Sequence, residues 1–231
     1  MAHTLYVVGT PIGNLGDIGP RALEVLGRVT LIACEEPPHT QRLLARYEIR
    51  TPTTRYTDAY DRKKQERMSR VLSALRRGDV AYVSNAGMPL VSDPGYELIQ
   101  AAQARGFETV VLLGPTAASA ALAVSGLPPL PHTFLGFVPR KSGARRRFFA
   151  PYARDPRTLV AYESPNRLLA TLRDARAALG ERCVALANEL TKLYERTWRG
   201  TLSEAIAHLE REPPRGEYVV VIGGADVGLE G

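Results

Sequence analysis

A run of small and turn-forming residues near the middle of the chain is the segment best suited to hold a ligand. Residues 84–95 read SNAGMPLVSDPG and stand between the apolar stretch Val80–Val83 and a helix-like stretch that begins at Tyr96. Small side chains leave backbone N–H and C=O groups open to close approach. In an open α/β sheet, ligands bind at the carboxyl ends of the strands. We therefore predict a binding loop here rather than a simple connection.

Two further loops of the same character follow predicted strands. Residues 9–16 read GTPIGNLG, and residues 114–120 read GPTAASA. Parallel strands end at the same edge of a sheet, so these loops and the central one are expected to converge. The glycine spacing G-x-x-x-G-x-x-G, and Pro11 with its missing N–H, do not match a dinucleotide-binding fingerprint. Since no Walker A pattern occurs either, the expected ligand is nucleoside-like and not a nucleotide polyphosphate.

Two strand ends in the second half of the chain place an acid next to a cation. Residues 162–167 read YESPNR, and residues 187–192 read ANELTK. Glu163, Glu189 and Lys192 are candidate site residues, because such groups in a polar turn can exchange protons. The same side chains would serve equally well as a buried ion-pair set that holds the two halves of the chain together.

A dense run of cations, residues 140–147, follows the strand-like residues 132–138. Its five cations stand with no acid among them: Arg140, Lys141, Arg145, Arg146 and Arg147. Like charges this close repel one another unless they face water or an anion. They also stand at the start of a predicted helix, where the helix dipole disfavours cations. We interpret this basic run as a surface for backbone phosphates; the alternative is a solvated face.

The composition is that of a soluble globular protein with a basic charge balance. The chain has 231 residues, of which 45% are hydrophobic and 23% charged, and a formal net charge of +6. It contains no apolar stretch of about 18 residues and no secretory signal, so we expect a cytoplasmic protein with no membrane span. Cys34 and Cys183 both lie in apolar runs, and the four histidines form no metal-binding pair. We therefore expect buried free thiols and no metal site.

Apolar runs and turn signals predict an α/β protein of two domains. In the first half, strands are expected over 4–9, 29–34, 80–84 and 109–113, with helices over 21–26, 39–47, 65–77, 96–105 and 116–124. This alternation of strands and helices predicts a mainly parallel sheet with helices on its faces.

The second half is expected to form a mixed sheet, because strands outnumber helices there. The prolines in 127–131 predict a linker over 128–131, hence domains over 1–127 and 132–231. Strands are expected over 132–138, 157–162, 184–188, 197–201 and 218–222, and helices over 144–152, 167–179 and 203–211. Ser203 is the expected N-cap of the last helix.

Seven segments of the chain carry a resemblance to a known family. In order they read LYVVGTPIGNLGDI, LIACEEPPHTQRLL, YVSNAGMPLVSDPGYELI, GPTAASAALAVSGLP, FLGFVPRKSGARRR, TLVAYESPNRLLATL and ANELTKLYERTWRGTL. Together they closely resemble the tetrapyrrole methylase superfamily and, within it, the bacterial methylases of small-subunit ribosomal RNA. The resemblance covers the chain from Leu5 to about Leu202. It implies S-adenosylmethionine as cofactor in a cleft between two α/β domains, and a homodimer. It also implies 2′-O-methylation of a cytidine in small-subunit rRNA, free or in the assembled small ribosomal subunit.

The same resemblance implies roles for particular residues. Around the cofactor it places Pro11, Asn85, Gly87, Met88, Leu90, Val91, Ser92, Thr116, Ala117, Tyr162 and Ala187. On RNA phosphates it places the basic run. A ribose hydroxyl has a high pKa, so a nearby base or cation would assist its methylation. The candidate catalytic residues are Glu35, Glu163, Glu189 and Lys192.

Several polar positions depart from the pattern usual in that family. Pro38 and Asn188 stand where an arginine is usual, Asn85 where an aspartate is usual, and Asn166 where a histidine is usual. The small and apolar positions match, so the fold is expected to be retained. Two alternatives to an active rRNA methylase stay open. One is a catalytically weakened relative that still binds cofactor or RNA, and the other is a methylase of a tetrapyrrole or other small molecule.

Overall fold

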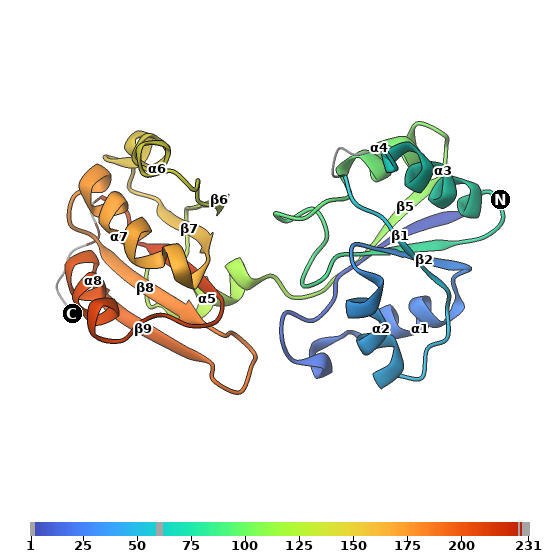
Figure 1. The fold of residues 1–231 in the computed structure, drawn as a ribbon, viewed down its shortest axis with the longest axis horizontal. Coiled ribbons are helices and arrows are strands. Elements are labelled where there is room, and N and C mark those ends of the chain that lie inside the picture. Colours follow the sequence, from blue (N-terminus) through green and yellow to red (C-terminus); the bar gives the residue numbers. More distant parts are fainter. Residues whose placement is uncertain (1–2, 59–61, 226, 228–231) are drawn as a thin grey trace. The chain divides into compact units, whose positions relative to one another are not determined.

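The structure, a computed structural model, describes residues 3–58, 62–225 and 227 (Figure 1). The chain divides into two compact units, Met1–Thr116 and Ala117–Gly231. Each unit is built on one five-stranded sheet. The predicted fold class, a parallel sheet followed by a mixed sheet with helices on their faces, is confirmed.

The first unit is a parallel sheet in the strand order β3-β2-β4-β1-β5. In chain order its elements are β1 (Thr4–Val8), the short η1 (Leu15–Asp17), α1 (Pro20–Arg28), β2 (Leu31–Cys34), α2 (Pro37–Arg46), β3 (Thr53–Arg55), α3 (Lys64–Leu75), β4 (Val80–Val83), α4 (Tyr96–Gln103) and β5 (Glu108–Leu112). The strands β4, β1 and β5 are therefore direct neighbours, and the loops that follow them leave the same edge of the sheet.

Both faces of the first sheet are covered by helices. Figure 1 shows α3 and α4 on one side of the sheet, and α1 and α2 on the other. Successive residues of a strand point to opposite faces, so Val83 packs with α1 and α2 whereas Tyr82 packs with α3 and α4. Burial on both faces explains the continuous apolar run of β4, and it fixes where the following loop begins.

The second unit is a mixed sheet in the strand order β6-β7-β10-β8-β9. In chain order its elements are α5 (Ala117–Ser125), β6 (His132–Phe137), α6 (Ser142–Phe149), the short η2 (Ala150–Tyr152), β7 (Thr158–Glu163), α7 (Pro165–Leu179), β8 (Cys183–Asn188), β9 (Arg196–Thr201), α8 (Leu202–Arg211) and β10 (Tyr218–Ile222). β6 pairs with β7 in parallel, and β10 is antiparallel to both β7 and β8. The strands β6, β7 and β8 therefore end at the same edge.

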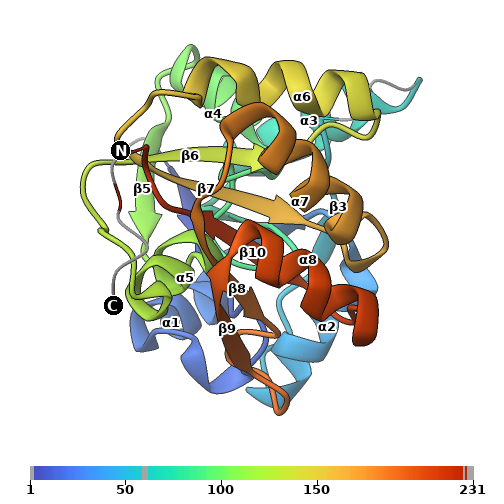
Figure 2. The same ribbon diagram turned by 90° about the vertical axis from the view of Figure 1, so that its left-hand side faces the viewer.

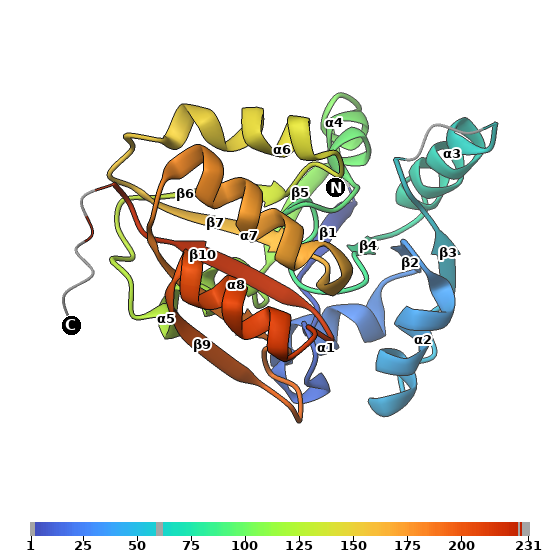
Figure 3. The ribbon, with the colours of Figure 1, turned by 60° about the vertical axis from the view of Figure 1, so that its left-hand side comes forward.

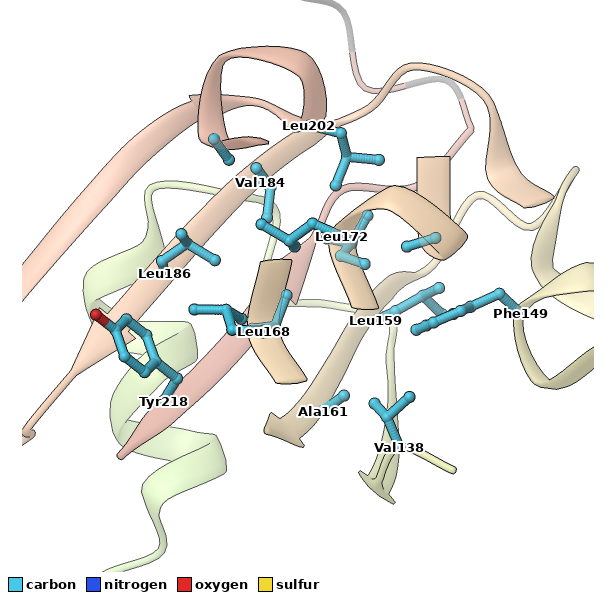
Figure 4. Close-up of a cluster of buried hydrophobic side chains, with 14 of the residues drawn as sticks. Val138, Phe149, Leu159, Ala161, Leu168, Leu172, Val184, Leu186, Leu202 and Tyr218 are labelled. Carbon is cyan, nitrogen blue, oxygen red and sulfur yellow. The ribbon is translucent and has the colours of Figure 1, made fainter. Parts of the chain in front are cut away.

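Helices α6, α7 and α8 lie side by side over one face of the second sheet (Figures 2 and 3). Leu168 and Leu172 of α7 pack there with Leu159 and Leu186 of the strands, and Phe149 extends the cluster under α6 (Figure 4). Helix α5 contacts the same sheet through β10, β8 and β7. The compact units consequently meet at Thr116, before α5, whereas the prolines predicted a boundary at 128–131.

Three details differ from the sequence-based prediction. The edge strand β3 was not predicted, because its three residues TTR carry no apolar periodicity and depend on pairing with β2. Helix α8 is capped by Thr201 and not by Ser203: Thr201 and Glu204 form a reciprocal capping box. Cys34 is buried as expected, but Cys183 is only half-buried.

No helix in the described part of the chain is long and apolar enough to cross a membrane.

Candidate functional site

The loops after β1, β4 and β5 are joined to one another at the edge of the first sheet. The Thr10 N–H donates to the Gly87 carbonyl (2.9 Å), and the Gly87 N–H donates to the Thr10 carbonyl (3.0 Å). The Gly9 N–H donates to the Leu112 carbonyl at 2.9 Å. We call residues 9–16, 84–95 and 114–116 the cradle. The predicted convergence of these loops is therefore observed within the first unit.

Two glycines set the closest approach of the loops in the cradle. A Cβ on Gly9 would lie 2.5 Å from the Gly114 nitrogen and 2.6 Å from the Met88 sulfur, and one on Gly114 would lie 2.7 Å from the Gly9 carbonyl carbon. The Gly114 N–H donates to the Met88 thioether with an N···S distance of 3.2 Å. Only residues without a side chain allow this packing. Because the Met88 sulfur lies against both glycines, Met88 helps to hold the first and third loops together.

The central loop of the cradle adopts strained backbone conformations. Gly87 has φ +78° and Gly95 has φ +126°, and two residues with side chains, Leu90 (φ +72°) and Ser92 (φ +68°), are also left-handed. Such conformations cost of order 1–3 kcal/mol each for residues with side chains, and they cluster at ligand sites. The loop therefore keeps its shape only because its surroundings hold it there.

Two buried tyrosines and one carboxylate hold the end of this loop. The Tyr82 hydroxyl donates to the Pro94 carbonyl at 2.6 Å, and the Gly95 N–H donates to Asp58 at 2.6 Å. Asp58 also accepts a hydrogen bond of 2.8 Å from the Tyr56 hydroxyl. Burial raises the pKa of both tyrosines, so their hydroxyls remain protonated donors. These bonds position the loop for whatever binds against it.

Asn85, at the carboxyl end of β4, carries an unpaired acceptor. Its side-chain oxygen is buried and has no hydrogen-bond partner among the described residues. A buried oxygen without a partner is costly, and native proteins usually pair it with a donor from protein, water or ligand. A ligand bearing an N–H or O–H group would satisfy it.

Asp93 is a candidate site residue that the sequence analysis missed. Pairing of Cys34 with Val83 in β2 and β4 makes Glu35 and Ser84 neighbours at the sheet edge, and the Asp93 side chain hydrogen-bonds Ser84. Burial raises the pKa of Asp93 to about 6, and the charge of Glu35 adds to the shift although the Ser84 bond opposes it. From the sequence alone Asp93 is indistinguishable from an ordinary turn residue. It becomes a candidate only because the pairing of β2 with β4 brings Glu35 close to the Ser84 that Asp93 contacts.

Glu163, a predicted catalytic residue, is a buried carboxylate in an ion pair. The Arg167 guanidinium lies 2.6 Å from one carboxylate oxygen, which also accepts from the Ser164 N–H at 2.7 Å. The Thr171 hydroxyl donates to the other oxygen at 2.6 Å. These contacts tie the end of β7 to α7 inside the second unit. They form an ion pair within one unit, and none of these partners belongs to the other half of the chain.

Glu189 and Lys192 are also partners of each other. The Lys192 ammonium lies 2.9 Å from Glu189 and 2.8 Å from Glu217. A hydrogen bond from the Glu217 N–H, with help from Lys192, lowers the pKa of Glu189. Burial alone would lower the pKa of Lys192, but the carboxylates of Glu217 and Glu189 outweigh it and raise that pKa. Asn188 holds the same turn by donating to the Arg215 and Glu217 carbonyls at 3.0 Å.

The remaining predicted cofactor residues fall in both units. In the cradle Pro11 is buried, Met88, Leu90 and Val91 are half-buried, and Ser92 is exposed. Thr116 and Ala117 stand at the boundary between the units. Ala187 is buried in β8, and the Tyr162 hydroxyl accepts from the Ala118 N–H at 3.3 Å.

The basic run divides into one structural residue and a group of exposed cations. Arg145, predicted to contact RNA phosphates, is buried and donates to Asp174 at 2.8 Å. Arg146 also pairs with Asp174 at 2.9 Å, although its side chain is 61% exposed. Arg140, Lys141 and Arg147 are exposed, and no carboxylate in the described ranges forms an ion pair with them. They are the cations available to a ligand.

Comparison with known proteins gives the family. Residues 4–206 match the family model of the tetrapyrrole (corrin/porphyrin) methylases. The chain is 45% identical over 223 residues to "Ribosomal RNA small subunit methyltransferase I" of Synechocystis sp., covering 96% of the chain and 79% of that protein. It is 44% identical over 223 residues to the protein of the same name from Thermotoga maritima, covering 96% of the chain and 99% of that protein. The protein belongs to the tetrapyrrole methylase family.

A solved structure agrees with this assignment at the level of the fold. The uroporphyrin-III C-methyltransferase from Thermus thermophilus, complexed with S-adenosyl homocysteine, superposes with a TM-score of 0.64 at 20% identity. The match covers 96% of this chain and 97% of that chain.

Proposed function

We propose that the protein transfers a methyl group from S-adenosylmethionine to the ribose 2′-hydroxyl of a cytidine in small-subunit ribosomal RNA. Two relatives that match 96% of the chain carry the name "Ribosomal RNA small subunit methyltransferase I". The observation that carries the proposal is the cradle, in which Gly9, Gly87 and Gly114 bring the backbones of adjacent strand-end loops together. A nucleoside-sized ligand can then lie directly against main-chain groups.

The residues of the cradle suit S-adenosylmethionine. The unpaired Asn85 oxygen accepts from an N–H or O–H group, and the cofactor carries both in its adenine, ribose and amino-acid parts. Met88, Leu90 and Val91 are half-buried in the same loop and offer apolar surface to a flat base. When bound, the cofactor supplies an activated methyl group on its sulfonium, so the protein has to position the reactants and manage one proton.

Asp93 and Glu35 are the groups best placed in the first unit to accept that proton. Glu163 and Glu189 are each held in an ion pair with a cation, and the pKa of Glu189 is lowered, so neither carboxylate is free to approach a substrate hydroxyl. Asp93 and Glu35 form no ion pair within the described residues. A carboxylate whose pKa lies near neutral pH is an effective general base under working conditions. We therefore propose that this pair, and not the acids of the second unit, assists deprotonation of the hydroxyl.

The exposed cations of the basic run supply a surface for the RNA backbone. Arg140, Lys141 and Arg147 lack carboxylate partners in the described part of the chain, so binding phosphates breaks no ion pair. Contacts of this kind provide affinity without sequence information and make binding sensitive to salt.

The test is methyl transfer to small ribosomal subunits and to their isolated RNA, both from cells that lack this methylation. With S-adenosylmethionine labelled in its methyl group, we expect label in 2′-O-methylcytidine after digestion to nucleosides. The Gly87→Arg variant should transfer none, because a side chain there starts 3.2 Å from the Pro115 carbonyl at a positive φ. Cofactor binding without transfer would support the weakened-relative alternative. Label in a tetrapyrrole but not in RNA would support the small-molecule alternative.

We also propose that the protein is a cytoplasmic homodimer. Its location follows from the proposed ribosomal substrate. Leu193 and Tyr194, which are 88% and 76% exposed, offer apolar surface of the kind that interfaces bury. Sedimentation equilibrium should therefore give twice the chain mass, and a monomer at assay concentration would contradict this part of the proposal.

A further inference from the structure

The second unit presents an exposed aromatic ring at the end of β6. β6 and β7 pair in parallel, with a shift of register between Phe134 and Gly136. Side chains alternate along a strand, so Phe134 and Phe137 would face opposite sides of a regular strand. The extra residue of the bulge, with Gly136 at φ +66°, places both rings on the same side. Bulges that redirect side chains in this way are frequent beside functional sites.

Both phenylalanines pack edge-on against one tyrosine. The ring centroids of Phe134 and Phe137 lie 5.0 and 5.4 Å from that of Tyr162, with interplanar angles of 65° and 66°. The Tyr162 hydroxyl accepts from the Ala118 N–H, so this central ring is itself fixed. Phe137 nevertheless remains 60% exposed. A rigidly supported, exposed aromatic ring is typical of a binding surface and not of a core.

The chain that continues from this ring is strongly basic. Residues 132–154 contain six cations and no acid. The α7 carboxylate that contacts this segment, Asp174, already pairs with Arg145 and Arg146. A ligand that suits both the ring and the cations has flat bases and a polyanionic backbone. Single-stranded RNA has both, whereas a duplex hides its base faces within the stack.

We propose that Phe137, supported by Tyr162, stacks on an unpaired base of the substrate RNA while Arg140, Lys141 and Arg147 contact the adjacent phosphates. This rests on the proposed RNA substrate and adds that the protein binds a single-stranded segment through a base face. The ring and the cations have separable signatures: stacking depends on the base, whereas phosphate binding depends on salt.

The experiment compares two fluorescein-labelled RNA strands of equal length, oligocytidylate and an abasic ribose-phosphate strand. Phe137→Ala and Phe137→Leu should weaken oligocytidylate binding about 10-fold, which corresponds to one stacked base. Neither should change the slope of affinity against salt or the affinity for the abasic strand. A Lys141→Ala/Arg147→Ala double variant should weaken binding to both strands and flatten the salt slope.

Phe134→Leu is the matched control, because Phe134 packs on the same face of the aromatic cluster but is half-buried. It should bind oligocytidylate as the unmodified protein does. Any of these results would overturn the inference: unchanged oligocytidylate affinity in Phe137→Leu, an equal loss on the abasic strand, or the same loss in Phe134→Leu. A loss of S-adenosylmethionine affinity in Phe137→Ala with RNA affinity intact would assign the ring to the cofactor and also overturn it.

The same measurements distinguish failure of this inference from failure of the proposed function. If the Phe137 variants bind and methylate small-subunit RNA as efficiently as the unmodified protein does, the stacking role is contradicted but the proposed function is not. If the unmodified protein binds no RNA, both proposals are contradicted.

Discussion

The close packing of Gly9 and Gly114 makes a single methyl group a sharp probe of the cradle. In Gly114→Ala the new Cβ would lie 2.7 Å from the Gly9 carbonyl carbon and 3.0 Å from its oxygen, whereas ordinary contact begins near 3.4 Å. The two backbones must therefore separate by about 0.7 Å, since 3.4 − 2.7 = 0.7. Neither contact is with a flexible side chain, so the strain cannot be relieved locally. Overpacking of this kind costs roughly 1–3 kcal/mol.

The same displacement should reach the ligand. A backbone hydrogen bond of 2.9 Å such as that from Gly9 to Leu112 is lost when its atoms separate by that amount. We expect Gly114→Ala to lower the free energy of unfolding by about 1–3 kcal/mol. We also expect at least a 10-fold lower affinity for S-adenosylhomocysteine, the equivalent of about 1.4 kcal/mol. Urea denaturation measures the first and isothermal calorimetry the second.

Gly27→Ala is the matched control. Gly27 is exposed near the end of α1, and a Cβ there meets nothing within 4 Å. The substitution should leave ligand affinity unchanged and stabilise the protein by up to about 1 kcal/mol, because alanine favours the helix. Wild-type affinity in Gly114→Ala would refute the placement of the ligand against these loops.

Three further predictions concern charged side chains. The folded-state pKa of Asp93, about 6, exceeds its unfolded value of 3.8, so the folded chain binds more protons between these values and stability falls as pH rises through that window. Asp93→Asn should remove this loss of stability at high pH. Urea denaturation at pH 8 should show a free energy of unfolding roughly 1–2 kcal/mol higher in the variant, a figure reduced for solvent screening of the partly exposed carboxylate. An unaltered pH dependence of stability in the variant would contradict this prediction. Arg145→Ala should destabilise by about 3 kcal/mol because it breaks a buried pair with Asp174, whereas Arg147→Ala should change stability by less than about 0.5 kcal/mol; the reverse order would be inconsistent with the structure. Glu163→Gln should cost about 1–3 kcal/mol in unfolding free energy yet leave the pH profile of turnover in place; lost turnover at full stability would instead assign it a catalytic role.

Apolar runs and turn signals in the sequence were sufficient to predict most of the strands and helices. The strand β4 could be predicted because burial on both faces demands a continuous apolar run, Val80–Val83. β3 could not, since three residues at a sheet edge take their conformation from the neighbouring strand. The prolines that predicted a linker over 128–131 mark a break in regular structure, whereas the division of the compact units at Thr116 reflects the contacts of α5 with the second sheet.

In the candidate site too, some features could be predicted from local sequence, whereas others depend on residues far apart in the chain. The convergence of the loops at Gly9, Gly87 and Gly114 followed from small residues at strand ends, a purely local signal. The burial of Arg145 could not be foreseen, because its partner Asp174 lies on another helix. Asp93 was missed for a similar reason, since its shifted pKa depends on the adjacency of β2 and β4.

The most direct test of the central claim is a crystal structure with S-adenosylhomocysteine bound. We predict the nucleoside in the cradle, with a donor within hydrogen-bond distance of the Asn85 side-chain oxygen and with its base against Met88, Leu90 or Val91. A ligand bound elsewhere, for example in the cavity of about 260 Å³ lined by Tyr6, Arg28 and Glu108, would contradict the account.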